Sequence, residues 1–232
     1  MLDPRGILFD LDGTLVDTSR DITANINRAF QSMGYRQLSH ETILSHVGYG
    51  AHFLVQKCLE ENYNDIKVDE KLVTTIWEKF REFYRNHIID EAQPYPGVID
   101  FLETEERPMG VVSNKPEEMV RAVLTELHLD HHFKFMWGRD TLPVSKPDPQ
   151  IIRYAIHELG MDQASKVCMV GDNPVDTIAA KGAGAISVAV SYGFTPVAIL
   201  EQENPDYLFH EFQAFVNEIQ PALGKKSHLF RR

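Results

Sequence analysis

The sequence contains little cysteine and no long apolar stretch. Its 232 residues include two cysteines, Cys58 and Cys168. A pair this sparse, in an expected helix and an expected buried strand, indicates two buried thiols and neither a disulfide framework nor a zinc site. No run is long and apolar enough to cross a bilayer, and the first residues lack the basic start and cleavage site of a signal peptide. We therefore expect a soluble, cytoplasmic protein.

Positive charge is also scarce. The 23 Lys and Arg residues stand against 34 Asp and Glu residues, which gives a formal net charge of −11. Nucleic acids and anionic membranes require a basic face, so this composition argues against both as partners. A small phosphate ester is compatible with it, because a few local cations or a bound metal ion can hold a phosphate whatever the net charge.

Short apolar runs alternate with helical patterns over most of the chain. Between the runs, apolar residues recur at helical spacing, with Pro116 at one expected helix start and Gly160 at one expected helix end. This alternation predicts an α/β fold, a doubly wound, Rossmann-like parallel sheet with helices on both faces. The expected strands are residues 7–11, 110–113, 135–137, 167–170 and 185–190.

The pattern changes between Asp17 and about Ala92. No strand-like run occurs there, and apolar residues recur only at helical spacing. We therefore expect a core domain of residues 1–16 and 91–232, into which a helical cap domain of residues 17–90 is inserted. A chain of this length can bury one substantial core and still form a smaller second module.

Two acidic residues follow the first expected strand. Asp10 and Asp12 lie two positions apart, so the alternation of a strand sends both side chains to one side, and Gly13 permits a sharp turn beyond them. A simple turn is an alternative explanation. An EF-hand calcium loop is not, because its sixth and twelfth positions need glycine and glutamate, where this chain has Leu15 and Asp21.

The longer string DLDGTLVD, which begins at Asp10, resembles the first motif of the haloacid dehalogenase superfamily. Each later motif alone has an ordinary explanation as a helix cap, a surface lysine or a turn. All of them, however, lie at or beyond the carboxyl ends of expected strands, the edge where open α/β sheets bind ligands. The segments that resemble the later motifs are Val111–Asn114, Lys146–Pro149 and Gly171–Asp176, in the order of the superfamily.

This resemblance implies a magnesium-dependent phosphatase and a role for each motif residue. Asp10 is the expected nucleophile, which forms an aspartyl-phosphate, and Asp12 is the expected general acid and base. Ser113 and Lys146 are expected to hold the phosphoryl oxygens. The expected Mg²⁺ ligands are Asp10, Asp172 and the backbone carbonyl of Asp12.

The resemblance also assigns supporting residues and narrows the reaction. Asp176 and Asn114 are expected to contact the catalytic residues and the metal ligands without touching the substrate. Asp176 would orient Lys146 or a metal-bound water. Asp12 favours a phosphatase or a mutase over a dehalogenase, because only the former protonate an alcohol leaving group. A mutase that resembles β-phosphoglucomutase would carry a cap histidine at the position of Ile22, so hydrolysis is favoured.

Over its full length the chain resembles the phosphoglycolate phosphatase branch of the superfamily, for example in Asp17–Ile22 and Val190–Phe194. The implied substrate is 2-phosphoglycolate, and other sugar phosphates, nucleotides or pyrophosphate remain as alternatives. The helical insertion resembles a mobile cap that closes over the substrate, with Tyr49 and His52 as the expected specificity residues. The expected oligomeric state is a monomer or a homodimer.

Two readings from other classes compete with a phosphatase. A receiver-type phosphorylation switch also gathers acids, a hydroxyl group and a lysine at one sheet edge, but in a different order along the chain and without a cap. The other rival is an inactive relative that serves as a binding module. The presence of all five primary residues argues against that module.

Overall fold

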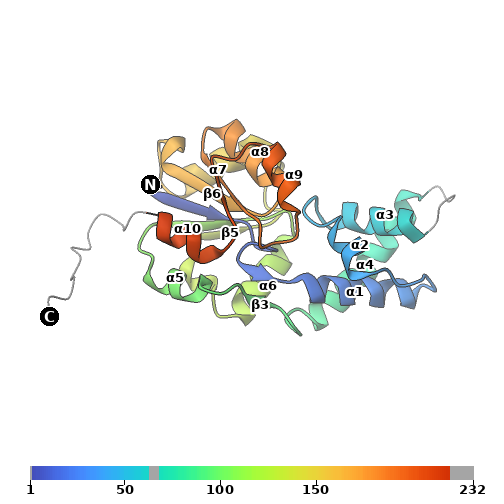
Figure 1. The fold of residues 1–232 in the computed structure, drawn as a ribbon. Helices are drawn as coiled ribbons and strands as arrows, with labels where there is room; N and C mark the ends of the chain where they lie inside the picture. Colours follow the sequence, from blue (N-terminus) through green and yellow to red (C-terminus); the bar gives the residue numbers. More distant parts are fainter. Residues whose placement is uncertain (1, 63–67, 220–232) are drawn as a thin grey trace.

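The computed structural model describes residues 2–62 and 68–219, and Figure 1 shows a sheet flanked by helices with a further group of helices to one side. In this part of the chain, six parallel strands form one sheet in the order β5-β4-β1-β6-β7-β8. The strands are Gly6–Phe9 (β1), Met109–Val112 (β4), Phe135–Trp137 (β5), Val167–Gly171 (β6), Ile186–Val190 (β7) and Tyr207–Phe209 (β8).

The central strand β1 lies between β4 and β6. Its Phe9 pairs with Val111 on one side and with Val170 on the other. Because β4 and β6 lie on opposite sides of β1, the connections that lead to them diverge at its carboxyl end, and a crevice forms there. The architecture therefore places the ends of β1, β4 and β6 side by side.

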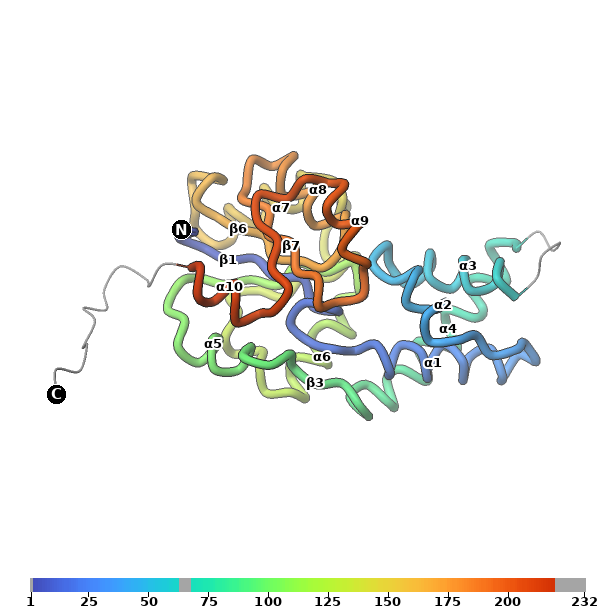
Figure 2. The backbone as a smooth tube through the Cα atoms, viewed as in Figure 1, coloured from blue at the N-terminus to red at the C-terminus, as the bar shows by residue number. Residues whose placement is uncertain are grey.

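Helices cover both faces of the sheet, as the ribbon and the backbone tube both show (Figures 1 and 2). Successive residues of β1 face opposite layers: Leu8 packs with α7 and α8, whereas Ile7 and Phe9 pack with α5, α6 and α10. The central strands are therefore apolar on both faces. The helices are Val98–Thr104 (α5), Glu117–Glu126 (α6), Pro149–Glu158 (α7), Pro174–Ala183 (α8), Val197–Gln202 (α9) and Phe212–Glu218 (α10), with short 3₁₀ turns at Asp130–His132 and Ala164–Lys166.

The expected α/β fold with a doubly wound parallel sheet is confirmed, and it differs from the sequence expectation in two details. The first strand ends at Phe9, so Asp10 begins the loop and does not lie inside a strand. The sheet also has an edge strand, Tyr207–Phe209, which the sequence analysis did not predict. This strand has three half-buried residues, so it lacks the continuous apolar run that identifies a central strand.

The helical insertion lies between two short strands, Val16–Asp17 (β2) and Gln93–Pro94 (β3), which pair in antiparallel fashion. Its longest helix, α4, begins after Asp69, whose side chain accepts a hydrogen bond from the Leu72 amide at 2.7 Å. The helices are Ser19–Ser32 (α1), His40–Leu44 (α2), Ala51–Asn62 (α3) and Glu70–Asn86 (α4).

The division at residues 17–90 stays a prediction, and the last part of the expected core, residues 220–232, lies outside the described residues. The helices of the insertion begin at Ser19 and end at Asn86, within the expected cap range. Among the described helices, none combines the length and the apolar character that a membrane span requires.

We predict that Phe9→Ala lowers the free energy of unfolding by about 3–5 kcal/mol, because the Phe9 ring is buried and the surrounding rings cannot fill the space. Its ring centroid lies 6.2 Å from that of Phe101 and 6.3 Å from that of Phe215. Urea denaturation measures the change. The control is Tyr154→Ala on α7. Because Tyr154 is 45% exposed, its substitution should lower the free energy of unfolding by less than about 0.5 kcal/mol. Similar losses in both variants would contradict the prediction.

Candidate active site

The structure brings four of the predicted site residues together at the carboxyl edge of the sheet. Asp10 follows β1, Ser113 follows β4 and Asp172 follows β6, while Lys146 comes from the loop between β5 and α7. All four are buried. Because the three strands are neighbours in the sheet, residues far apart in the sequence end beside one another.

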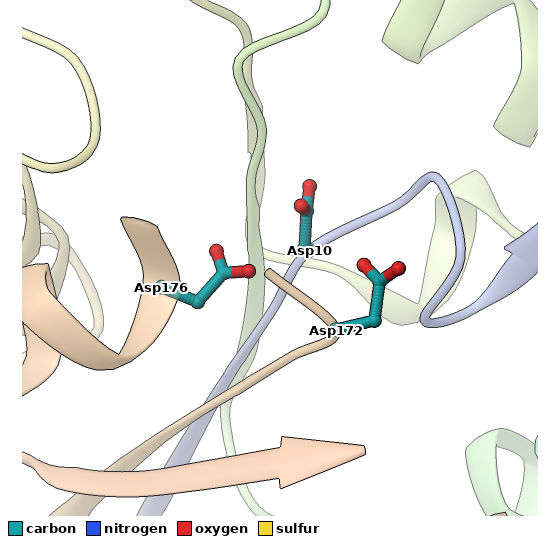
Figure 3. A group of neighbouring side chains, drawn as sticks. All are labelled: Asp10, Asp172 and Asp176. Atoms are coloured by element: carbon teal, nitrogen blue, oxygen red, sulfur yellow. The ribbon is translucent and has the colours of Figure 1, made fainter. Parts of the chain in front are cut away.

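Three carboxylates form a compact buried group. Asp10, Asp172 and Asp176 each offer an oxygen atom, and these atoms lie within 4.8 Å of one another. Figure 3 shows the three side chains converging from the β1 loop, the end of β6 and the first turn of α8. Gly13 allows the loop after β1 to lie directly against Asp172, because its φ is +78° and a Cβ atom there would lie 2.3 Å from Asp172 Oδ2.

One lysine is embedded in this acidic group. The Lys146 Nζ lies 2.6 Å from Asp176 Oδ1 and 3.1 Å from Asp10 Oδ2. Burial alone would lower the pKa of Lys146, but the two carboxylates outweigh it and hold the pKa above its ordinary value. The side chain therefore stays an ammonium ion that offsets part of the negative charge.

Asp172 is the third carboxyl group of this cluster. Its Oδ2 accepts a hydrogen bond from the Phe194 amide at 2.7 Å, and its Oδ1 accepts one from Thr14 Oγ1 at 3.3 Å. Burial, and then the nearby Asp10 carboxylate, raise the pKa of Asp172 well above its ordinary value. Three carboxyl groups thus share one ammonium group, and their donor atoms are all oxygen, which suits a hard divalent cation.

Asp176 contacts Lys146, the residue that it was expected to orient, and Asn114 contacts the backbone around the site. Asp176 Oδ2 accepts a hydrogen bond from the Asn173 amide at 3.1 Å, within a capping box that starts α8. The Asn114 side-chain amide donates to the carbonyls of Gly48 and Lys146, both at 2.9 Å. It therefore joins two core loops to the insertion. The roles of Asp176 and Asn114 in the chemistry stay predictions.

Asp12 stands apart from the acidic group. Its Oδ1 accepts a hydrogen bond from Thr18 Oγ1 at 2.6 Å, and its two oxygens lie 3.1 Å and 3.0 Å from Lys115 Nζ. The metal contact expected of Asp12 runs through its backbone carbonyl and stays a prediction. Lys115 was not among the residues predicted from the sequence, although its position directly after Ser113 and Asn114 placed it at the same sheet edge.

A pocket above these residues is lined by both the core and the insertion. Its core side includes Asp10, Asp12, Ser113 and Asp172. The insertion contributes apolar side chains and backbone from α1, α3, α4 and the loop before α3. These residues are Ile22, Val47, Gly48, Gly50, Ala51, Leu54 and Phe80.

The two residues expected to set specificity, Tyr49 and His52, are not among those that line this pocket. Tyr49 is 43% exposed, and its ring packs against Phe53 at a centroid distance of 5.1 Å. His52 packs against Trp77 at 5.4 Å. The neighbouring backbone at Gly48 and Gly50 does reach the pocket, so the role assigned to the two side chains has no support from their positions and stays a prediction.

Comparison with known proteins identifies the family. Residues 7–190 match the family model described as haloacid dehalogenase-like hydrolase. The chain belongs to this family. Among the curated relatives of this hydrolase, the phosphoglycolate phosphatase of Neisseria meningitidis is 34% identical over 232 residues, which is 96% of each chain. That of Agrobacterium fabrum is 31% identical over 222 residues, which covers 94% of this chain and 92% of the relative.

Solved structures of the haloacid dehalogenase-like family have the same fold. The crystal structure of a predicted phosphoglycolate phosphatase from Haemophilus somnus superposes with a TM-score of 0.86 at 30% identity. The superposition covers 94% of this chain and 98% of that one. The membership expected from the four motifs is therefore confirmed.

We predict that Asp172→Asn raises the free energy of unfolding of the protein in EDTA by about 1 kcal/mol. The variant removes a buried charge that Asp10 repels, and it keeps both contacts, because an amide oxygen can accept from the Phe194 amide while the Thr14 hydroxyl reverses to accept. A carboxyl whose pKa is raised on folding costs stability as the pH rises above its unfolded pKa of about 3.9. The gain should therefore increase with pH, as thermal unfolding at several pH values would measure.

The matched variant Asp176→Asn should change stability in the opposite direction, by roughly 2–3 kcal/mol. Both oxygens of Asp176 accept hydrogen bonds from nitrogen donors, Lys146 Nζ and the Asn173 amide. In the Asn variant the side-chain NH₂ group would face one of these donors, and neither an ammonium group nor a backbone amide can accept a hydrogen bond. The same substitution is thus expected to stabilise at one position and destabilise at the other. Equal effects of one sign would contradict this account of the acidic group.

Proposed function

We propose that this protein hydrolyses 2-phosphoglycolate to glycolate and inorganic phosphate, with Mg²⁺ as cofactor and a transient aspartyl-phosphate on Asp10. The general class, a phosphoric monoester hydrolase, follows from the family and from its phosphatase relatives. Because the family and these relatives are hydrolases, a phosphatase is favoured over the receiver-type switch and over the inactive binding module.

The surroundings of Asp10 carry the proposal. This carboxylate lines the pocket at the end of the central strand, and the Leu11 amide donates a hydrogen bond to its Oδ1 at 2.7 Å. Lys146 Nζ lies 3.1 Å from its other oxygen. An oriented carboxylate beside a fixed ammonium ion and a hydroxyl group is what nucleophilic attack on a phosphate ester requires, because the charge on the phosphoryl oxygens must be offset while the carboxylate approaches.

The first step transfers the phosphoryl group to the enzyme. Asp10 attacks phosphorus, its new oxygen–phosphorus bond forms as the ester bond breaks, and Asp12 gives a proton to the departing oxygen. In the second step water attacks phosphorus and Asp12 takes a proton from it. The bond to Asp10 then breaks, which restores the carboxylate and releases inorganic phosphate. Asp12 lines the same pocket, and the Thr18 hydroxyl orients its carboxylate.

Ser113 and Lys146 hold the transferred group in this scheme. Ser113 Oγ accepts a hydrogen bond from the Lys115 amide at 3.3 Å, which leaves its hydroxyl proton to be donated to a phosphoryl oxygen. Lys146 is fixed by Asp176 and so presents its charge without reorganisation.

The acidic group is the proposed metal site. Asp10 and Asp172 would hold Mg²⁺ together with the backbone carbonyl of Asp12, and Asp176 would fix Lys146 beside them. The oxygen-only donor set supports this assignment, as does the raised pKa of Asp172, which a bound cation would lower. When bound, the ion would neutralise charge on the phosphoryl oxygens and align them with the nucleophile.

The proposed substrate rests on the named relatives, and the pocket supports a small ester. The insertion closes it with apolar side chains such as Leu54 and Phe80. The relatives from Neisseria meningitidis and Agrobacterium fabrum carry the name phosphoglycolate phosphatase. Other sugar phosphates, nucleotides and pyrophosphate are the alternatives that a substrate panel would separate.

The proposal is tested by the steady-state release of phosphate from a panel of esters. With Mg²⁺ present we expect the highest kcat/KM for 2-phosphoglycolate, and EDTA should abolish turnover until Mg²⁺ is restored. Asp10→Asn should remove turnover on every ester, by roughly 10⁴-fold or more, because an amide cannot act as the nucleophile. A higher kcat/KM for another ester would overturn the substrate, whereas an active Asp10→Asn variant would overturn the mechanism.

Asp12→Asn should lower kcat for 2-phosphoglycolate by about 10²–10⁴-fold, because its alkoxide leaving group needs a proton. For the phosphorylation step, measured with 4-nitrophenyl phosphate as a burst of 4-nitrophenol, the loss should be much smaller, since this phenolate leaves without protonation. Thr23→Val on α1, where a half-buried hydroxyl hydrogen-bonds to His40 Nδ1, serves as a control outside the pocket. Equal losses of the phosphorylation rate for both esters would argue against Asp12 as the general acid.

A further inference from the structure

Lys115 lies between the core and the insertion, and its side chain has no role in the proposed mechanism. Its side chain is 5% exposed, and its ammonium group pairs with both oxygens of Asp12, at 3.0 and 3.1 Å. The same group lies 4.5 Å from the centroid of the Tyr84 ring on α4. The ion pair with Asp12 and the contact with the Tyr84 ring hold this ammonium group in place.

Lys115 is also the only positively charged side chain among the described residues that line the pocket. The other buried lysine at this edge, Lys146, pairs with Asp10 and Asp176 and serves the phosphoryl group in the proposed mechanism, which leaves Lys115 as the cation for the rest of the substrate. Around Lys115 the pocket wall includes the apolar side chains of Phe80 and Met119. Because apolar walls exclude water, an anion that enters this space interacts with the cation more strongly than it would in solvent.

The position beside Asp12 determines which part of a substrate meets this cation. The leaving oxygen of the ester must reach Asp12 to receive its proton, and Lys115 Nζ lies 3.0 Å from that carboxylate. In 2-phosphoglycolate a single methylene group separates the leaving oxygen from the carboxylate. A substrate held in line for transfer therefore brings its own carboxylate next to Lys115.

The local contacts permit Lys115 to exchange partners. Asp12 keeps the hydrogen bond from Thr18 Oγ1, at 2.6 Å, when the ammonium group turns to another anion. The Tyr84 ring can stay against the ammonium group, since a cation–π contact uses the ring face and leaves the N–H donors for carboxylate oxygens.

We propose that Lys115 is a specificity-determining residue that binds the carboxylate of the substrate, an inference that rests on the proposed function. It selects small phosphate esters that carry a second anionic group next to the ester carbon. Esters of the same size without that group can still be hydrolysed by the motif residues, but they gain nothing from this cation.

The test compares two esters of similar size, 2-phosphoglycolate and ethyl phosphate, in the full-length protein with saturating Mg²⁺. Lys115→Met keeps the length of the side chain and its packing against Tyr84 but removes the charge. We expect the ratio of kcat/KM values, 2-phosphoglycolate over ethyl phosphate, to fall by about 10²-fold, mostly through KM for 2-phosphoglycolate. An effect that acts only through Asp12 cancels in this ratio, because both esters need the same acid.

Lys115→Arg should retain most of the ratio, because it keeps the charge, and the matched control Lys134→Met at the amino side of β5 should leave it unchanged. If Lys115→Met does not fold, as judged by circular dichroism, Lys115→Gln provides the same comparison. A ratio that survives loss of the charge overturns the role of Lys115 and leaves the proposed function intact. A wild-type protein that does not favour 2-phosphoglycolate over ethyl phosphate overturns both.

Discussion

The structure of the site depends on one buried ammonium group placed among carboxylates. Lys146 Nζ contacts Asp10 and Asp176, while Asp172 completes the acidic group without direct contact to the lysine. Removing such charges from water is costly unless they are paired and hydrogen-bonded. The pairing therefore fixes the β1 loop, the loop before α7 and the start of α8 relative to one another. It also gathers three carboxyl groups around one ammonium group, a set of oxygen donors suited to a divalent cation.

Amide groups extend this constraint from the core to the insertion. The side chains of Asn114 and Asn173 donate hydrogen bonds to the carbonyls of Gly48 and Val47, so two core loops hold the segment before α3. Gly48 allows the contact because its φ is +115° and a Cβ atom there would lie 2.2 Å from Asn173 Nδ2. Farther out, Arg81 and Arg85 of α4 pair with Glu118 of α6. In this arrangement the insertion and the core line the pocket together.

Most of the fold could be predicted from the sequence because its signals are local. The strand-like run that begins at Ile7, which the structure ends at Phe9, and the helical spacing of Ile22 and Ile26 each reflect burial on a regular element. The edge strand Tyr207–Phe209 could not be predicted in this way, because its three residues pair on one side only and are half-buried. The positions of Tyr49 and His52 were also beyond local signals, since the direction of a side chain on a loop or helix depends on what packs around it.

By itself, the sequence determined the α/β class, the helical insertion and the identity of the polar residues at the strand ends. These features follow from periodicity and from motifs whose residues are neighbours along the chain. Only the tertiary structure decided that Lys115 pairs with Asp12 beneath Tyr84, and that Phe80 and Leu54 line the pocket. These contacts join segments that are separated by many residues, so they are set by the packing of the insertion on the sheet edge and have no signature in any single stretch of sequence.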